Sequence, residues 1–196
     1  MVSDKRLNLA SQSPRRQQFL QQLGVDFVVV NAPVDEQAHG AESAVDYVER
    51  VARLKAAAGV ACCEVGAVVL AADTIVTHGG ALLGKPSDRD HARTILQQLS
   101  GQWHEVITAV VVVDSAQTTH CRVVAARVQF VQLDERMIAA YLNSSEGEDK
   151  AGAYAVQGLG GALVRRIEGS YSAVVGLPLA ETVTLLDIAG VRHALQ

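Results

Sequence analysis

Apolar and polar positions along this chain follow two patterns, one typical of strands and one typical of helices. Short apolar runs, several rich in β-branched residues, predict strands at 7–10, 27–30, 68–74, 106–113, 122–133 and 162–167. Apolar residues spaced three and four apart predict helices at 14–23, 44–61, 88–99, 135–142 and from 179 onward. Ser43, Ser87 and Asp134 are the expected N-caps of the second, third and fourth of these helices, Tyr47 belongs to the apolar face of the second, and a turn is expected at 169–172. Strands therefore alternate with helices, except for one stretch of adjacent strands in the middle of the chain. This order is that of an α/β protein.

The run at 68–74 is the centre of the functional prediction. It is β-branched at its start, has small residues near its end, and stops on Asp73 and Thr74. Such a run is typical of a buried strand covered on both faces. In open α/β sheets, ligands bind outside the carboxyl ends of the strands, so Asp73 would be delivered to a binding edge. The alternative is that Asp73 only opens a turn before a hairpin tip at Gly79–Gly80.

The first predicted helix carries two cationic residues in its first turn. Ser13 suits the N-cap and Pro14 the first helical position, so Arg15 and Arg16 follow directly. Cations oppose the helix dipole there, and the placement makes sense if an anion shares the site with the free backbone N–H groups. This favours a phosphate site, and the alternative is a solvated basic helix start.

Further charged residues are candidates for the same site. The pair Asp35–Glu36 lies in a loop after the strand at 27–30, and one of its carboxylates could join Asp73 around a divalent metal, or the pair could belong to a solvated acidic loop. Lys55 falls beside the apolar face of the helix at 44–61, where it could extend to solvent or point into a site. Lys85 stands between Gly84, which would permit a close backbone approach, and a stiffening proline.

Composition limits the classes of function. A chain of 196 residues can bury a large core as one domain, with or without a division into two lobes. The formal net charge of -4 argues against a broad nucleic-acid footprint, so an anionic ligand needs a local cluster of Lys and Arg. No apolar run could span a bilayer and the N-terminus lacks a signal-peptide pattern, so we expect a soluble, cytoplasmic protein.

The cysteines and histidines offer no metal site. Cys62, Cys63 and Cys121 have neither a disulfide framework nor a zinc spacing, and we expect them to be small buried hydrophobes. The six histidines are scattered without ligand spacing, which favours surface or structural roles.

Several short motifs, ordered along almost the whole chain, resemble those of one family. They are Leu9–Arg16, Ala72–Thr74, Gly84–Pro86, Leu99–Gly101, Asp149–Tyr154, Gln157–Gly158 and Val174–Pro178. Each motif alone is weak, but their order and spacing together are specific. The chain resembles the Maf family, the septum-formation-type nucleoside triphosphate pyrophosphatases.

This resemblance implies a fold, a reaction and a cofactor. The fold would be a mixed, twisted central sheet flanked by helices, similar to that of inosine triphosphatases, in two lobes with a nucleotide in the cleft between them. The whole chain, 1–196, would be one such domain. The reaction would be hydrolysis of a nucleoside triphosphate between the α and β phosphates, and it would require Mg²⁺ or Mn²⁺. The protein would form a homodimer and bind neither nucleic acid nor a membrane.

The same resemblance implies residue roles. Asp73 would be the general base and, with Glu36, would hold the metal. The phosphate-handling residues would be Ser11, Arg15, Arg16, Lys55 and Lys85. The chemistry is consistent, because attack on phosphorus needs a deprotonated water and neutralised phosphate oxygens.

Three positions would mark the substrate. Arg15, Thr74 and Gln157 match the members that act on dTTP and UTP, while the branch that resembles 7-methyl-GTP pyrophosphatases differs there. A glutamine amide can pair with a pyrimidine edge through both donor and acceptor. Ala155 stands where the family's glycine is expected, which would cost about 1 kcal/mol if that position had a positive φ. Two alternatives stay open: 7-methyl-GTP hydrolysis, and a non-enzymatic nucleotide-binding regulator of septum formation.

Overall fold

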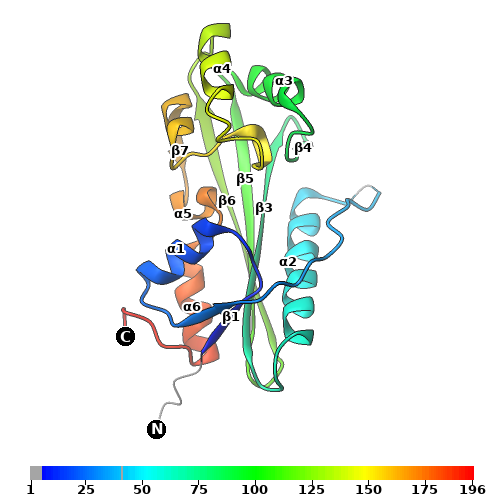
Figure 1. Cartoon of the computed structure of the whole chain (residues 1–196), viewed down its shortest axis with the longest axis vertical. Coiled ribbons are helices and arrows are strands. Elements are labelled where there is room, and N and C mark those ends of the chain that lie inside the picture. Colours follow the sequence, from blue (N-terminus) through cyan, green and yellow to red (C-terminus); the bar gives the residue numbers. More distant parts are fainter. Residues whose placement is uncertain (1–5, 41) are drawn as a thin grey trace. The chain divides into compact units, whose positions relative to one another are not determined.

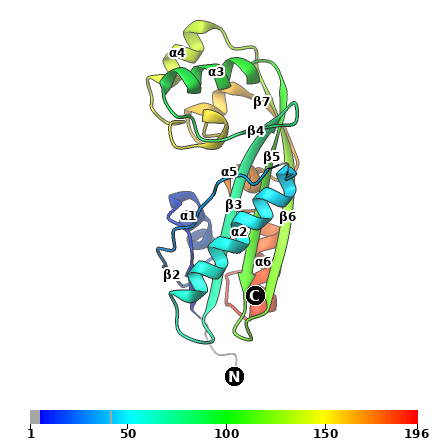
Figure 2. The ribbon, with the colours of Figure 1, turned by 90° about the vertical axis from the view of Figure 1, so that its right-hand side faces the viewer.

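The computed structural model describes residues 6–40 and 42–196 (Figures 1 and 2). Its α-helices are α1 (Pro14–Gln22), α2 (Ala44–Ala61), α3 (Arg89–Leu99), α4 (Glu135–Leu142), α5 (Tyr171–Val175) and α6 (Leu179–Ala189). Its strands are β1 (Leu7–Leu9), β2 (Phe27–Val29), β3 (Val68–His78), β4 (Ala81–Leu83), β5 (Trp103–Val113), β6 (Thr119–Phe130) and β7 (Val164–Glu168). Two short 3₁₀ segments are η1 (Ala151–Ala153) and η2 (Leu159–Leu163).

The strands of the described residues form one mixed sheet of seven, in the order β2-β1-β3-β5-β6-β7, with β4 paired to β3. Strand β1 runs parallel to both β2 and β3, whereas β4 is antiparallel to β3 and β7 is antiparallel to β6. The predicted mixed α/β sheet flanked by helices is therefore confirmed.

The chain divides into two compact units, each built from separate segments of the sequence. Unit 1 contains residues 1–73, 108–124 and 176–196, and unit 2 contains residues 74–107 and 125–175. Each unit has its own apolar cluster: Leu7, Leu20, Leu70 and Leu185 are core members in unit 1. In unit 2 the cluster gathers around Phe130, between residues of α3, α4, β5 and β6.

Strand β3 shows how unit 1 sorts its side chains. Val68, Leu70 and Ala72 belong to the cluster with α1 and α6. Because successive side chains of a strand point to opposite faces, the alternate residues Val69 and Asp73 face the other way. On that face Val69 lies against Gly59 of α2, and Asp73 contacts Lys55 of α2. The alternation of β3 thus directs Asp73 toward α2.

The prediction that the strand ends at Asp73 is wrong, and so is the alternative that Asp73 opens a turn. Strand β3 continues to His78, so Asp73 lies in its middle and is 7% exposed. The carboxylate does not stop the strand, because a cation on α2 compensates its charge. The turn comes later, at Gly79 and Gly80, whose φ angles of 59° and 82° suit a tight hairpin and agree with the predicted tip.

Helix starts largely follow their capping residues. The predicted cap Ser43 accepts a hydrogen bond from the Asp46 N–H, and Asp134 accepts one from the Met137 N–H. Ser13 occupies the N-cap of α1, although its side chain makes no capping hydrogen bond. Helix α3 is a correction, because Asp88 rather than Ser87 caps it and accepts from the His91 N–H at 2.8 Å.

Two other sequence predictions are wrong. A turn was expected at 169–172, but residues 171–175 form the short helix α5. The cysteines are not buried: Cys62 is exposed, and Cys63 and Cys121 are partly exposed free thiols. Helix α5 is too short to show a helical period of apolar residues, so the sequence could not predict it. The cysteines lie near the ends of a helix and a strand, where small side chains need not enter a core.

None of the described helices is long and apolar enough to cross a membrane.

Candidate active site

Lys55 joins two carboxylates in unit 1. Its Nζ lies 2.7 Å from Oδ1 of Asp73 on β3 and 3.0 Å from Oε1 of Glu36, which follows β2. The side chains of Lys55 and Asp73 are only 15% and 10% exposed, whereas that of Glu36 is 45% exposed. Of the two orientations open to Lys55, the structure therefore has the one pointing inward rather than into solvent.

Close packing of α2 on the sheet places this lysine. A Cβ on Gly59 would lie 2.7 Å from Cβ of Ala10 and 2.9 Å from Cγ1 of Val69, so only glycine allows α2 to approach so closely. Lys55 is one helical turn before Gly59 and therefore lies on the same side of α2. The sequence of α2 thus combines a close approach at one turn with a cation at the preceding turn.

Arg16 is a second fixed cation of unit 1. It is only 9% exposed, its Nε donates to the carbonyl of Gly176 at 2.9 Å, and its Nη1 donates to Oγ of Ser11 at 3.0 Å. Burial lowers the pKa of Arg16 below its usual value, while the negative charge of Asp73 opposes that effect. A guanidinium stays protonated in such surroundings, so α1 presents a preoriented positive charge. The half-buried Arg15 precedes it.

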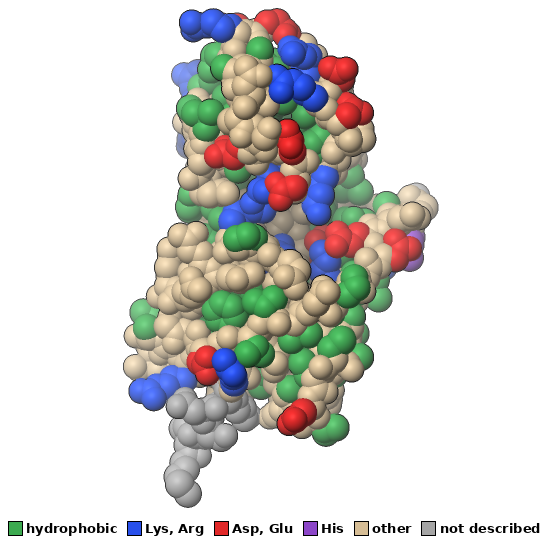
Figure 3. Space-filling model, in the orientation of Figure 1, with side chains coloured by type: hydrophobic (Ala, Val, Ile, Leu, Met, Phe, Trp, Pro, Cys, Tyr) green, Lys and Arg blue, Asp and Glu red, His purple; other side chains and the backbone are tan. Residues whose placement is uncertain are grey.

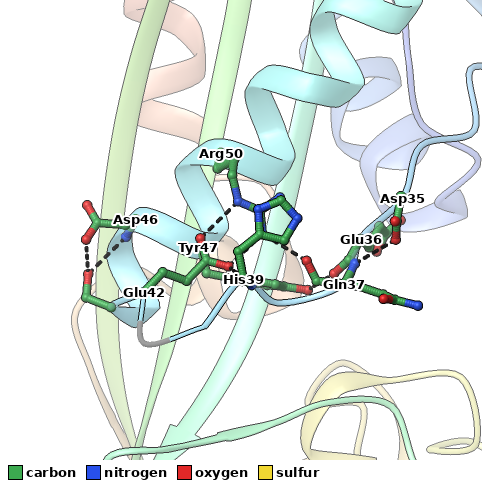
Figure 4. A network of polar contacts seen from close by, with 9 residues as sticks. Asp35, Glu36, Gln37, His39, Glu42, Asp46, Tyr47 and Arg50 are labelled. Atoms are coloured by element: carbon green, nitrogen blue, oxygen red, sulfur yellow. Dashed lines mark hydrogen bonds and ion pairs between the residues drawn. The ribbon is translucent and has the colours of Figure 1, made fainter.

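The segment that carries Glu36 is tied to α2 by a polar network (Figure 4). The Tyr47 hydroxyl donates to the backbone carbonyl of Glu36 at 2.7 Å, and Nη2 of Arg50 donates to that of Gln37 at 3.0 Å. Arg50 also binds the Glu42 carboxylate through two nitrogens, at 2.9 and 2.6 Å, which lowers the pKa of Glu42 to about 2. Helix α2 therefore carries Lys55 and also holds the segment that contains Glu36.

Sequence reasoning missed Tyr47, Arg50 and Glu42. Tyr47 was assigned to the apolar face of the helix at 44–61, and nothing local distinguishes Arg50 from an ordinary surface cation. The spacing of Tyr47 and Arg50 was the available indication, because residues three apart on a helix are neighbours and can contact the same segment of chain.

The other three site candidates belong to unit 2. Thr74 follows Asp73 in β3 and is half-buried, and both Lys85 and Gln157 are exposed. The expected close approach at Gly84 is not observed, because an added Cβ there would meet nothing within 4 Å. The Gly84 carbonyl instead accepts the Gly152 N–H at 3.3 Å, which ties the segment of Lys85 to η1.

The alanine at position 155 carries no left-handed strain. The described non-glycine residues with positive φ are Gln117, Ser145 and Ala153, so Ala155 is outside that region. The expected cost of about 1 kcal/mol therefore does not apply at this position.

The carboxylates of unit 1 suit a partly hydrated metal rather than a protein cage. No group of three or more His, Cys, Asp or Glu residues that could hold an ion occurs among residues 6–40 and 42–196. Asp73 and Glu36 nevertheless both contact the ammonium group of Lys55, so the two carboxylates already face one cation. Mg²⁺ is usually bound by one or two carboxylates together with water and substrate phosphates, and this donor set fits that pattern.

The surface is consistent with a local anion site. On the face drawn in Figure 3, basic and acidic side chains are interspersed, and no broad basic area covers that face. This distribution differs from the extended basic surface typical of nucleic-acid-binding proteins.

Comparison with known proteins gives a family and several similar sequences. A family model described as Maf-like protein matches residues 6–189. The dTTP/UTP pyrophosphatase of Escherichia coli K12 is 53% identical over 181 residues, covering 92% of this chain and 91% of that protein. The proteins of the same name from Hahella chejuensis and Methylobacillus flagellatus are 48% and 49% identical and cover 96% and 97% of this chain, and 94% and 96% of their own lengths.

A solved structure agrees at the level of the fold. A HAM1 protein from Coxiella burnetii superimposes with a TM-score of 0.50 at 16% identity, over 94% of this chain and 100% of that chain. At this identity the likeness concerns the fold alone.

Proposed function

The chain belongs to the Maf family, and from that premise we propose that it is a pyrophosphatase that hydrolyses dTTP and UTP to the monophosphate and pyrophosphate. The similar proteins named for this activity are about half identical over more than nine-tenths of the chain and supply the substrate class. The observation that carries the chemistry is the buried Asp73 carboxylate, held by Lys55 beside Glu36.

Asp73 acts as the general base in this proposal. Attack on the phosphoanhydride requires a water that loses its proton as it approaches phosphorus, and a carboxylate within hydrogen-bonding reach can accept that proton. The contact with Lys55 orients the carboxylate at its Oδ1, and in this proposal Oδ2 accepts the proton. Burial in β3 fixes the direction of the side chain before the substrate binds.

The cations of unit 1 handle the phosphates. Arg16 is held by Ser11 and the Gly176 carbonyl, so its positive charge is already oriented. We assign phosphate binding to Arg15, Arg16 and Lys55 in unit 1 and to Lys85 in unit 2. Fixed charges of this kind stabilise the negative charge that develops on phosphate oxygens, because no reorganisation is needed during reaction.

A divalent metal belongs to this activity, as it does generally in the family's pyrophosphatases. Asp73 and Glu36 are the residues that would hold Mg²⁺ or Mn²⁺ in this chain. When bound, the ion neutralises phosphate charge and lowers the pKa of a coordinated water.

Base selection rests on Arg15, Thr74 and Gln157. Gln157 offers both a donor and an acceptor, which a uracil or thymine edge can satisfy. A site that hydrogen-bonds one base leaves polar groups unpaired when another base enters, and this penalises the wrong substrate.

We further propose that residues 1–196 act as one domain, because the family match spans both units. We also propose that the protein is a homodimer, as the family resemblance suggests.

The test is pyrophosphate release by the purified protein with Mg²⁺, measured separately for dTTP, UTP, dCTP, ATP, GTP and 7-methyl-GTP. We expect dTTP and UTP to give the highest kcat/KM. Faster hydrolysis of GTP or 7-methyl-GTP would overturn the proposed preference. Binding of nucleotides without any pyrophosphate release would favour the regulator instead.

The variant Gln157→Glu tests the base reader within the same assay. It removes the amide donor and adds a negative charge, so turnover of UTP should fall relative to that of 7-methyl-GTP, whose base is cationic. Glu148→Gln is the matched control, because Glu148 is an exposed glutamate of the same unit. Unchanged selectivity in Gln157→Glu would show that Gln157 does not read the base.

A further inference from the structure

The carboxylate of Glu146 binds the backbone of the loop that carries Gln157. Glu146 follows α4, and its Oε1 accepts the Leu159 N–H at 2.9 Å while its Oε2 accepts the Gly160 N–H at 2.8 Å. Both amides come shortly after Gln157 in the sequence. The side chain of Glu146 therefore fixes the loop on the carboxyl side of Gln157.

Tyr141 fixes the other side of the same loop. Its hydroxyl accepts the Ala155 N–H at 3.0 Å and donates to Oε2 of Glu146 at 3.0 Å. Tyr141 is only 2% exposed, and burial raises the pKa of its hydroxyl, so it stays protonated and able to donate. Ala155 and Leu159 stand on either side of Gln157, and one Tyr141–Glu146 pair thus holds both.

The glycines of the loop match the shape of this pair. A Cβ on Gly158 would lie 1.7 Å from Oε1 of Glu146, and a Cβ on Gly160 would lie 2.6 Å from the Ala155 carbonyl oxygen and 2.9 Å from the Tyr141 hydroxyl oxygen. Neither glycine has a positive φ among the described residues, so close approach, rather than backbone conformation, accounts for glycine there. The motif Gln157–Gly158 thereby acquires a physical reason: the residue after Gln157 lies directly against the Glu146 carboxylate.

The arrangement matters for function because Gln157 is exposed. An exposed side chain gains no orientation from packing, so the direction in which it leaves the chain depends on the backbone of its loop. A partly buried charge costs free energy unless its hydrogen bonds are satisfied, so the Glu146 carboxylate depends on the partners that the loop supplies. Here every described contact of that carboxylate goes to the Tyr141 hydroxyl or to the loop backbone.

We infer that Glu146 and Tyr141 are positioning residues that set base selectivity by fixing the loop 155–160 and thereby the amide of Gln157. The inference rests on the proposed function, in which Gln157 reads the base. Neither residue touches the reacting atoms in this scheme. Both act on the discrimination between bases and not on the chemical step.

The experiment measures kcat and KM for UTP and GTP in competition for Glu146→Gln and Tyr141→Phe. Glutamine has one acceptor oxygen in place of two, and its NH₂ group faces donors that need an acceptor. Tyr141→Phe removes a single oxygen. We expect the UTP/GTP ratio of kcat/KM to fall about tenfold in each variant through a higher KM for UTP, as the loss of one oriented hydrogen bond predicts. The ratio should not change in the exposed control Glu148→Gln.

A double-mutant cycle separates the inference from its premise. In the Gln157→Ala background, Glu146→Gln should change the ratio less than twofold, because the residue it positions is absent. A shift in Gln157→Ala alone, with no shift in Glu146→Gln or Tyr141→Phe, would overturn the inference and leave the base reader standing. An unchanged ratio in Gln157→Ala would overturn the base reader, and the positioning role with it.

Hydrogen exchange gives a direct readout that does not depend on activity. The amides of Leu159, Gly160 and Ala155 should be protected in the wild type, and those of Leu159 and Gly160 should exchange faster in Glu146→Gln while the core of unit 2 stays protected. If Glu146→Gln fails to fold, Tyr141→Phe carries the test, with loss of protection expected at Ala155. Unchanged protection at these amides would contradict the inference.

Discussion

His104 makes the stability of unit 2 depend on pH. Its ring is 2% exposed and packs edge-on against Phe130 and Tyr154, with centroids 5.0 and 5.4 Å apart. Nε2 lies 2.8 Å from the Tyr154 hydroxyl, while Nδ1 has no hydrogen-bond partner among the described residues. Burial, together with the nearby His78, lowers the pKa of His104 from 6.5 to about 4. Protonation would add a buried charge and a second donor with no acceptor.

The magnitude follows from proton linkage. The folded state keeps His104 neutral to about pH 4, whereas the unfolded chain binds the proton below about pH 6.5. The full stability is therefore present above pH 6.5 and is lost as the pH falls toward 4. The loss is about 1 kcal/mol at pH 6, about 2 kcal/mol at pH 5 and about 3 kcal/mol at pH 4.

Urea unfolding followed by tryptophan fluorescence measures this loss. The single tryptophan, Trp103, precedes His104 in β5 and reports on unit 2. Between pH 7 and pH 5, the free energy of unfolding should fall by about 2 kcal/mol less in His104→Gln than in the wild type. The exposed His39→Gln is the control and should behave as the wild type does. Equal pH dependence in all three proteins, or an NMR titration of His104 in the native wild type near pH 6.5, would refute the reasoning.

Two other outcomes test the packing of α2 and the metal. Gly59→Ala should lower the free energy of unfolding by about 1–3 kcal/mol, because the new Cβ meets Ala10 and Val69. Gly84→Ala is the control and should not lower it, because its Cβ meets nothing within 4 Å. Equal stability of the two variants would contradict the close approach of α2 to the sheet. Chelation should abolish pyrophosphate release without changing the melting temperature, since the ion is held jointly with substrate; a metal that survives dialysis without nucleotide would contradict this.

The elements of this chain could be predicted where local patterns decide them. The helix 44–61 has an apolar face and a capping serine, and both its bounds and its cap agree with the structure. The Gly79–Gly80 hairpin could be predicted equally well, because glycine readily adopts the positive φ that both residues of a two-residue hairpin turn need. Boundaries failed where a competing residue stood next to the expected one, as at Asp88 beside Ser87.

Asp73 shows why local sequence is insufficient for the site. A carboxylate normally ends an apolar strand, and this one does not because Lys55, which lies 18 residues earlier in the sequence, neutralises it. The same holds for Arg50 on the Glu36 segment and for Glu146 under the Gln157 loop. Each residue gains its role only when the fold brings a distant backbone segment against it. Sequence motifs identified the candidate site residues, whereas the contacts that orient them required the structure.

The central claim is that Asp73 activates water for pyrophosphate release. The most direct measurement is kcat for UTP in Asp73→Asn, with nucleotide binding measured in parallel and the exposed Asp26→Asn as control. Asparagine keeps the shape of the side chain but cannot take a proton from water. We predict a loss in kcat of about 10³-fold, with the fold and UTP binding retained and with Asp26→Asn as active as the wild type. A kcat in Asp73→Asn within tenfold of the wild-type value would contradict the claim.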